Sequence, residues 1–350
     1  MKKNLFSFAG IEEEITDDTP KPENIKDFSI YTAEEIINNT FNYFREIGFK
    51  PKKIPLHICK QEINRLNKNN NINTLQRTIS CYDVADSYHP HRMEVKCNNH
   101  FSPKEGFFVD KKLYKSIQKD ILSGKLIREN IPGFLNIVSG VQSASNFRPG
   151  YACYIYRKYC NKNDIVLDTS MGFGGRLVGF IASGINGKYI GIDPAKKTYD
   201  GNILLCQELG KNIETTLINK PCEDVILSEI GNVDLCFTSP PYYNREIYSD
   251  EDTQSCNRYT TPESWRDNFL KKMIELQYYA LNNNKYNIIN INDIKINKKT
   301  IPLVTWTKEI SENTGFEYIC TEKYQLNSRV GDGNNGDVAF EPVLVFKKCE

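Results

Sequence analysis

Apolar positions in the second half of the chain fall into short runs that are separated by segments with helical spacing. Five runs have the length of strands: Ile165–Leu167, Tyr189–Asp193, Val233–Phe237, Tyr286–Ile291 and Val343–Phe346. A helix is predicted over Arg176–Ser183, and a second one begins at Pro262 and carries Trp265, Phe269, Met273 and Leu276 along one side. This alternation predicts an α/β fold with a doubly wound, Rossmann-like sheet.

The first half of the chain has a different pattern. Residues 1–25 are acidic and poorly patterned, and predict a flexible arm. Thr32–Glu35 resembles a capping box and precedes apolar residues near helical spacing. A further helix is predicted over Lys112–Ile127, with Tyr114, Ile117, Ile121 and Leu122 on one face. We therefore expect a smaller, mixed but mainly helical domain over residues 26–130 and a catalytic domain over residues 131–350.

Composition indicates an ordinary globular protein. The 350 residues are 39% hydrophobic and 25% charged. No apolar run reaches the roughly 18–20 residues that span a bilayer, and the start has no secretory apolar region. The 11 cysteines lack the spacing of a disulfide framework, which favours reduced thiols. These features predict a cytoplasmic protein with no membrane partner.

The net charge of +1 neither favours nor excludes a nucleic-acid partner. Any surface for phosphates has to come from local clusters of basic residues. One such basic run comprises Lys104, Lys111, Lys112, Lys115, Lys119, Lys125 and Arg128. The alternative interpretation of such a run is a solvated helix face.

A glycine-rich turn follows the first predicted strand of the second half. Asp168 ends that strand, and Gly172 and Gly174 allow a close approach of the backbone to a ligand. The spacing differs from the dinucleotide pattern, while Asp193 at the end of the next strand is placed to accept two ribose hydroxyls. A cofactor with a ribose and no pyrophosphate fits, and S-adenosylmethionine is one. The alternatives are a simple tight bend, and a helix N-cap role for Asp193.

A second segment, Ser239-Pro240-Pro241-Tyr242, follows the strand Val233–Phe237. Two prolines remove two backbone donors and hold the chain extended, which leaves carbonyl groups free as acceptors. An exocyclic base amine could then give one hydrogen to Ser239 Oγ and the other to the Pro240 carbonyl. Such bonds concentrate the nitrogen lone pair for attack on a methyl group. Tyr242 offers a ring for a base taken out of its stack. A generic Pro-Pro loop is the alternative.

Taken together, these motifs resemble the amino-methyltransferases that act on DNA, which carry an S/N/D-P-P-Y/F motif. The resemblance covers about 200 residues, from Gln142 to the end, with the cofactor motif before the catalytic one. It implies a class I S-adenosylmethionine-dependent methyltransferase sheet and these cofactor-binding residues: Phe147, Asp168, Ser170, Gly172, Phe173, Gly174, Asp193 and Glu223 (or its neighbour Asp224). It implies catalytic roles for Ser239, Pro240, Pro241 and Tyr242. Ser170 departs from the family pattern, because an aromatic residue usually stands there.

The resemblance further implies double-stranded DNA with a flipped base as the partner, a restriction endonuclease as a second one, and a monomer or homodimer. Serine before Pro-Pro favours N4 of cytosine over N6 of adenine. An RNA base N-methyltransferase and a non-catalytic S-adenosylmethionine-binding protein that recognises DNA remain alternatives. Residues 26–130 would supply target recognition, with the basic run on phosphates. The loop Asn244–Ser255, with Arg245 and Tyr248, is placed to fold over the base, and a solvated loop is the alternative.

Histidines and cysteines concentrate near the N-terminal side. All four histidines and three cysteines lie within 44 residues: His57, Cys59, Cys81, His89, His91, Cys97 and His100. Their spacing contains no C-x2-C or H-x3-H pair, so we expect ordinary packing and surface roles and no metal.

Overall fold

The computed structural model describes residues 32–123, 135, 138–296, 298–325 and 340–350. The predicted arm over residues 1–25, the basic residues Lys125 and Arg128, and the predicted domain boundary after residue 130 lie outside this part. The chain forms two compact units, each built from two stretches. Unit 1 comprises Met1–Pro55 and Pro90–Ala144, and unit 2 comprises Leu56–His89 and Ser145–Glu350.

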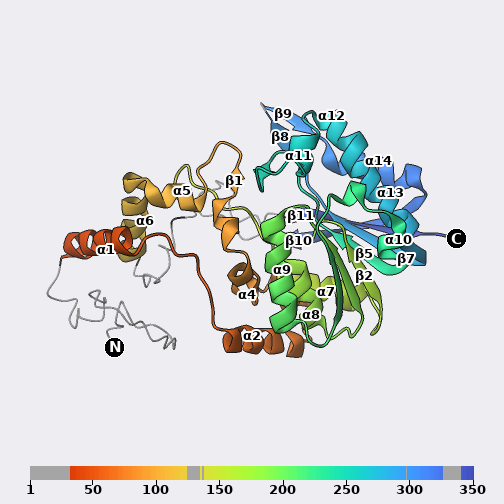
Figure 1. Cartoon of the computed structure of the whole chain (residues 1–350), viewed down its shortest axis with the longest axis horizontal. Coiled ribbons are helices and arrows are strands. Elements are labelled where there is room, and N and C mark those ends of the chain that lie inside the picture. The colour runs from red at the N-terminus through yellow and green to blue at the C-terminus, as the bar shows by residue number, and fades with distance from the viewer. Residues whose placement is uncertain (1–31, 124–134, 136–137, 297, 326–339) are drawn as a thin grey trace. The chain divides into compact units, whose positions relative to one another are not determined.

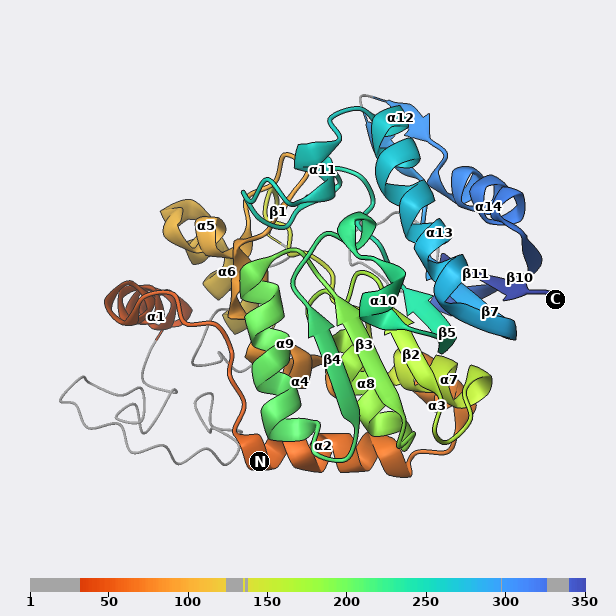
Figure 2. The same ribbon diagram turned by 45° about the vertical axis from the view of Figure 1, so that its right-hand side comes forward.

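Unit 2 is built around a seven-stranded sheet. Its strands in spatial order are β10 (Phe316–Gln325), β11 (Phe340–Lys348), β7 (Leu281–Asn290), β5 (Val233–Thr238), β2 (Ile165–Asp168), β3 (Lys188–Ile192) and β4 (Glu214–Ile218). β11 is antiparallel to both neighbours, and the other pairs are parallel. The chain runs outward from β2 through β3 to β4, and then from β5 to β7 on the other side (Figure 2). The predicted Rossmann-like α/β sheet is confirmed, and its switch point lies between β2 and β5.

Helices cover both faces of the sheet. Figure 1 shows α7 (Pro149–Tyr159), α8 (Gly175–Ser183) and α9 (Lys196–Leu209) on one face, and α10 (Leu227–Ile230), α13 (Lys271–Ala280) and α14 (Leu303–Thr314) on the other. Between the sheet and α13, an apolar core includes Leu167, Ile190, Cys236 and Met273. Shorter elements are β6 (Glu246–Ile247), β8 (Ile294–Ile296), β9 (Lys299–Ile301), η5 (Cys222–Asp224) and α11 (Ser255–Arg258).

The helix predicted at Pro262 is confirmed and has three consecutive parts. Thr261 caps it by accepting a hydrogen bond from the Ser264 backbone at 3.1 Å. α12 (Pro262–Trp265) continues through one π-helical stretch, η6 (Arg266–Leu270), into α13. Trp265, Phe269 and Met273 are buried, as their spacing predicts.

Three helices that precede residue 90 belong to unit 2: α2 (Leu56–Lys68), α3 (Ile72–Arg77) and α4 (Tyr82–Tyr88). They pack on α8, α7 and α9, respectively, and bury Leu66, Leu75 and Val84. Arg157 of α7 also donates to the Asn67 and Asn69 carbonyls, at 2.6 Å each. The structure therefore divides the chain differently from the predicted domain of residues 26–130, because these helices complete the cover of the sheet.

Unit 1 is mainly helical. Its elements are α1 (Ala33–Ile47), η3 (Pro90–Glu94), β1 (Lys96–Cys97), α5 (Pro103–Phe108) and α6 (Asp110–Leu122). The Thr32–Glu35 capping box is confirmed in both directions. A small core contains Ile37, Phe44, Phe107, Leu113, Ile117 and Leu135. Leu122, which was expected on the buried face of α6, is 69% exposed, so that assignment was wrong; Leu122 is the last residue of the helix.

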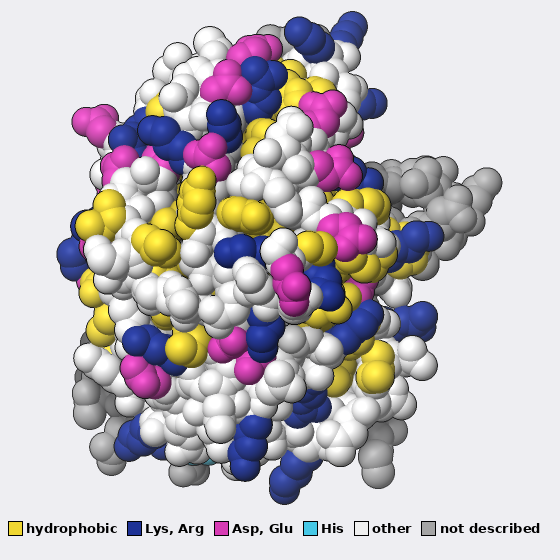
Figure 3. Space-filling view, turned by 90° about the vertical axis from the view of Figure 1, so that its right-hand side faces the viewer, with side chains coloured by type: hydrophobic (Ala, Val, Ile, Leu, Met, Phe, Trp, Pro, Cys, Tyr) yellow, Lys and Arg dark blue, Asp and Glu magenta, His cyan; other side chains and the backbone are white. Residues whose placement is uncertain are grey.

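On the face of unit 2 that carries α13 and α14, neither basic nor acidic side chains dominate the surface (Figure 3). Basic, acidic and apolar side chains are intermixed there (Figure 3). This agrees with the small net charge. Within the part of the chain that the structure describes, every helix is too short or too polar to cross a bilayer.

Candidate functional site

The two predicted motifs lie next to each other at the carboxyl ends of β2 and β5. These strands are paired, with Leu167 opposite Cys236. A side-chain bond joins the strand ends, since Thr238 Oγ1 donates to Asp168 Oδ1 at 2.9 Å. The structure thus brings together the glycine turn and the Ser-Pro-Pro-Tyr segment in the crevice where α/β sheets bind ligands.

Asp168 is the centre of a buried network. Its carboxylate accepts from Arg176 Nε at 2.8 Å and Nη2 at 3.2 Å, and from the Tyr189 hydroxyl at 2.7 Å. Both members of the ion pair are almost fully enclosed, at 0% and 5% side-chain exposure. The Asp168 side chain therefore holds β2, β3, β5 and α8 together. Its predicted contact with a cofactor stays a prediction, because the carboxylate faces the protein.

The glycine turn adopts the left-handed backbone that its sequence suggests. Gly172 has φ 54° and Gly174 has φ 73°. A Cβ on Gly174 would lie 2.9 Å from both Asn202 Oδ1 and His89 Cε1. Asn202 Nδ2 donates to the Gly172 carbonyl at 2.8 Å. The carbonyl of Ser170, the predicted cofactor residue that departs from the family pattern, accepts from Arg176. The turn is therefore packed and hydrogen-bonded from inside the protein.

Asp193 lies directly beside this turn. Its Oδ2 accepts from the Gly172 backbone at 3.0 Å and its Oδ1 from the Ala195 backbone at 2.9 Å. The N-cap of α9 is Ala195 and no side chain caps it, so the alternative N-cap role for Asp193 is wrong. Burial raises the pKa of Asp193 to about 7, against the two backbone N–H groups that lower it. Each carboxylate oxygen can accept one further hydrogen bond.

Phe147 contributes to the site through its backbone. A Cβ on Gly175 would lie 2.0 Å from the Phe147 carbonyl oxygen, so only glycine fits there. The Phe147 ring points into the core: it stacks on Tyr324 at 5.0 Å, and the Arg176 guanidinium lies 5.3 Å from its centroid. The ring completes an aromatic cluster with Tyr324 and Phe237, and the predicted role of Phe147 in cofactor binding stays a prediction.

Two side chains that support the turn were not predicted in this role. Asn146 Nδ2 donates to the Phe173 carbonyl at 3.0 Å and to Asp86 Oδ1 at 3.1 Å. The His89 ring is 1% exposed, and its centroid lies 6.0 Å from that of Phe173. Asp86 lies in α4 and His89 is its C-cap, some eighty residues before the turn. No pattern in the residues around the turn therefore indicates that these side chains support it.

Ser239 and Tyr242 share two partners at the ends of other strands. Ser239 Oγ donates to Asn290 Oδ1 at 3.2 Å. The Tyr242 hydroxyl lies 3.4 Å from Asn290 Oδ1 and also 3.4 Å from Glu341 Oε2. Burial raises the pKa of Glu341, and the positive charge of Arg245 opposes that rise. Pro240 is buried, while Ser239, Pro241 and Tyr242 are partly exposed.

Tyr243, the second aromatic residue of the motif, has a structural role. It is 5% exposed, and its backbone takes the left-handed conformation with φ 52°. Its ring lies 6.2 Å from that of Trp265, and its hydroxyl donates to the Thr260 carbonyl. Only Tyr242 of the two therefore remains a candidate for stacking on a base.

The loop Asn244–Ser255 contacts both halves of the site. The Arg245 guanidinium lies 5.9 Å from the centroid of the Tyr242 ring. The Tyr248 ring lies 5.8 Å from that of Phe173 in the glycine turn. This placement is consistent with the predicted role of the loop as a cover and disfavours a freely solvated loop.

Glu223 lies in η5 beside β4 and is paired with the protein. Arg258 Nη1 lies 2.9 Å from the Glu223 carboxylate and 2.8 Å from that of Asp224. The Glu223 side chain is 1% exposed, and burial raises its pKa. Its predicted contact with the cofactor would have to compete with Arg258.

The histidines and cysteines of the N-terminal side are dispersed between packing and surface positions. His57 and His100 are exposed, whereas Cys59, Cys81 and Cys97 are buried. Among the described residues, no three side chains of His, Cys, Asp or Glu converge in a way that could hold a metal ion.

No family model and no curated protein matches this chain. Solved structures do match. A methyltransferase from Pyrococcus furiosus is 15% identical, with 58% of this chain and 83% of that chain covered and a TM-score of 0.39. A SAM-dependent O-methyltransferase from Thermotoga maritima is 12% identical over 59% and 68%, at 0.39. A putative RNA methyltransferase from Pyrococcus horikoshii is 13% identical over 58% and 83%, at 0.35. The sheet order and register of this chain establish its α/β fold independently of these likenesses.

Proposed function

We propose that this protein is a S-adenosylmethionine-dependent methyltransferase that acts on the exocyclic amine of a flipped base in double-stranded DNA. The observation that carries the proposal is the contact between the two motifs. The Ser239–Tyr242 segment and the glycine turn end adjacent parallel strands, and Thr238 is bonded to Asp168. A methyl donor in the turn and an amine at the segment would therefore be neighbours.

The residues around the turn fit the proposed cofactor. A Cβ on Gly172 would meet only the Ser170 carbonyl, at 3.8 Å, so one side of the turn is open for a ligand. Asp193 keeps acceptor capacity for ribose hydroxyls beside that opening. The open glycine and the carboxylate are the groups that would hold S-adenosylmethionine, which supplies an electrophilic methyl group on a sulfonium.

The acceptor side provides hydrogen-bond acceptors and a ring rather than a strong base. Ser239 Oγ and the Pro240 carbonyl would accept the two amine hydrogens and direct the nitrogen lone pair towards the methyl group. The amine nitrogen would then be held for transfer of that methyl group, and the amine would lose one proton to solvent. Tyr242, with Arg245 beside it, would stack on the base. No thiol or imidazole is required for this step.

Cytosine N4 is the acceptor that we favour over adenine N6, because serine precedes Pro-Pro. An RNA base amine offers the same geometry and is the second candidate. The third candidate is a protein that recognises DNA and binds the cofactor without catalysis. The intact Ser239–Tyr242 segment and Asp193 disfavour this candidate.

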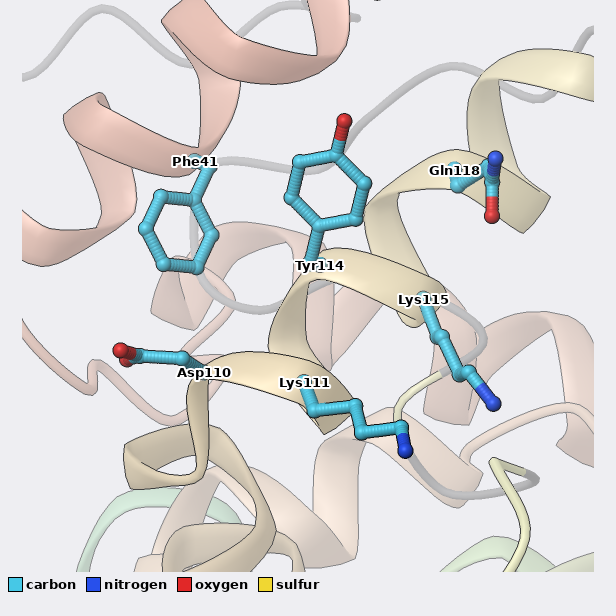
Figure 4. Close-up of a pocket in the computed structure, with 6 residues that line it drawn as sticks. All are labelled: Phe41, Asp110, Lys111, Tyr114, Lys115 and Gln118. Carbon is cyan, nitrogen blue, oxygen red and sulfur yellow. The ribbon is translucent and has the colours of Figure 1, made fainter.

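Unit 1 offers a surface for the nucleic acid. A shallow pocket of about 380 Å³ lies between α1 and α6 and is lined by Phe41, Asp110, Lys111, Tyr114, Lys115 and Gln118 (Figure 4). The rings of Phe41 and Tyr114 meet edge to face at 5.9 Å, and Lys111 and Lys115 are exposed one turn apart. Rings flanked by lysines suit a nucleotide, since the rings can contact a base and the ammonium groups the phosphates.

Transfer of a labelled methyl group tests the proposed function. Protein and labelled S-adenosylmethionine are incubated separately with double-stranded DNA, tRNA and rRNA, and sequencing of the modified polymer identifies the base. We expect label on DNA, at N4 of cytosine, and none with the Ser239→Ala/Tyr242→Ala double variant. Label on RNA alone would establish the second candidate. Binding of the cofactor without transfer to any polymer would leave only the third.

A further inference from the structure

Asn290, the last residue of β7, connects the catalytic segment to β11. The side chain is buried, at 1% exposure. Its Oδ1 accepts from Ser239 Oγ at 3.2 Å, with the Tyr242 hydroxyl 3.4 Å away, and its Nδ2 donates to the Pro342 carbonyl at 3.1 Å. Asn290 is one of many asparagines in the chain, and nothing in the sequence marks it.

The Pro342 carbonyl determines which way the Asn290 amide faces. A backbone carbonyl can only accept hydrogen bonds, so the amide nitrogen has to face it. The register of the sheet, with Val343 opposite Asn290, holds that carbonyl in place. Oδ1 must consequently face Ser239 and Tyr242. This orientation follows from the chemistry of the neighbours.

The direction of the Asn290 amide in turn determines the direction of the Ser239 hydroxyl. Oδ1 can only accept, so the Ser239 proton points at Asn290. The Tyr242 side chain also lies within hydrogen-bond reach of Ser239, so one lone pair of Ser239 Oγ remains for a further donor. A serine hydroxyl with a free proton could instead donate to the amine nitrogen, and that bond would occupy the lone pair needed for attack.

We propose that Asn290 is a positioning residue that turns the Ser239 hydroxyl into an acceptor-only group towards the substrate amine. The inference rests on the proposed function, because it gives Ser239 Oγ the role of accepting an amine hydrogen. Asn290 acts through Ser239 and has no need to contact the base itself. A serine hydroxyl can donate or accept, so a neighbour has to fix the direction of its proton, and Asn290 does so. An ionised carboxylate at the same position would need no such neighbour, because it can only accept.

A double-mutant cycle between Asn290 and Ser239 tests this coupling. Asn290→Leu keeps the branched shape of the side chain, at a larger volume, and removes the acceptor. On the polymer that the wild type methylates, we expect kcat to fall about tenfold, with KM for that polymer and Kd for S-adenosylmethionine within twofold. In a Ser239→Ala background, the same substitution should change kcat less than twofold, because no hydroxyl remains to be oriented. An equal loss in both backgrounds would overturn the proposal.

Asn287 provides the matched control. It lies three residues earlier on β7, is fully buried, and donates to Gln277 at 3.0 Å, away from Ser239. Asn287→Leu should destabilise unit 2, and its effect on kcat should be the same in the wild-type and Ser239→Ala backgrounds. If the Asn287 cycle shows the same coupling as the Asn290 cycle, the effect of Asn290 is general packing and the proposal is wrong.

Neutron diffraction on a deuterium-exchanged crystal tests the same idea without any substrate. The Ser239 deuteron should point at Asn290 Oδ1, and the two Nδ2 deuterons of Asn290 should include one on the Pro342 carbonyl. A Ser239 deuteron that points elsewhere refutes the inference. If the deuteron lies as expected and the wild type methylates neither DNA nor RNA, the proposed function fails while the orientation of Ser239 stands.

Discussion

The two strand ends that form the site are neighbours, yet they are held in different ways. After β2, the carboxylate of Asp168 is fully buried and bonded at 2.7–3.2 Å by the side chains of Arg176, Tyr189 and Thr238. After β5, the hydroxyls of Ser239 and Tyr242 are partly exposed and reach their partners at 3.2–3.4 Å. The cofactor side is a dense internal network, whereas the acceptor side rests on a few long contacts.

This difference fits the task of each side. The methyl donor is the same molecule in every turnover. A turn that is already packed before this molecule binds suits it, because binding then requires no further ordering of the turn. A base that must leave its stack meets a segment whose hydroxyls can still adjust. We therefore expect substitutions on the cofactor side to act on stability and affinity, and substitutions on the acceptor side to act on rate.

The largest effect should come from Arg176. Its replacement by methionine leaves the Asp168 carboxylate buried without its ion-pair partner, which costs about 3–5 kcal/mol of unfolding free energy. Urea denaturation of the full chain measures the loss. Arg266→Met is the control: Arg266 and its ion-pair partner Asp267 are 34% and 55% exposed, so the loss of that pair should cost at most about 1 kcal/mol. Similar losses in the two variants would show that the Asp168 network is not special.

Tyr242→Ala should affect rate and leave the cofactor side intact. The loss of base stacking, worth ~1–3 kcal/mol, corresponds to a drop in methyl transfer of about fivefold to about 150-fold. Calorimetry should give a Kd for S-adenosylmethionine within twofold of the wild type. Asp193→Ala should show the reverse order, with the cofactor affected most. Equal loss of cofactor affinity in the two variants would mean that the two halves are wrongly assigned.

The pH dependence of cofactor binding should report Asp193. Its pKa of about 7 means that the carboxyl is neutral below that pH, and only the ionised form can offer all its acceptors to the ribose. Affinity should therefore rise with pH up to about 7, by at most about tenfold per pH unit, and then level off. The charges that act on Asp193 are Asp168, which raises the pKa, and Arg176, which lowers it. Asp193→Asn should bind with a flat pH profile.

The same titration has the opposite sign for stability without the cofactor. Since the pKa of Asp193 lies above its ordinary value of 3.8, folding favours the protonated carboxyl. The stabilising contribution is complete below about pH 4 and is lost as the pH rises towards 7. The wild type should lose unfolding free energy relative to Asp193→Asn over this range, and equal profiles would contradict the raised pKa.

Tyr242→Phe should give the smallest change. It keeps the ring and removes only the two 3.4 Å contacts to Asn290 and Glu341. Methyl transfer should fall less than about threefold, since hydrogen bonds of that length contribute little. A loss as large as that of Tyr242→Ala would show that the hydroxyl, rather than the ring, is the important group.

Both motifs could be predicted from the sequence because each consists of consecutive or nearly consecutive residues. A strand followed by Gly172 and Gly174, or by Pro240 and Pro241, carries its own conformational signal. β4 and β10 were missed, because their exposed positions break up the apolar run that marks a strand.

The supporting residues were not predictable for a different reason. Asn290 meets Ser239, and Glu341 meets Tyr242, only through the pairing of β7 with β11, which depends on the register between distant segments. Asn146 and His89 support the glycine turn only once α4 has packed on α9. The placement of α2–α4 in unit 2 likewise depends on contacts such as those of Arg157 with two distant carbonyls.

The interleaving of the two units has a consequence for how the protein is made. During synthesis, α2–α4 are made before α7–α9, the helices on which they pack. Their apolar faces therefore stay exposed to solvent until α7–α9 have also been synthesised. A gene fragment that starts at residue 131 would omit these helices, and Gly150 of α7 would lose its neighbours Leu75 and Thr78. Expression of the sheet alone should therefore require Leu56–His89 to be supplied, either in the same chain or as a separate peptide.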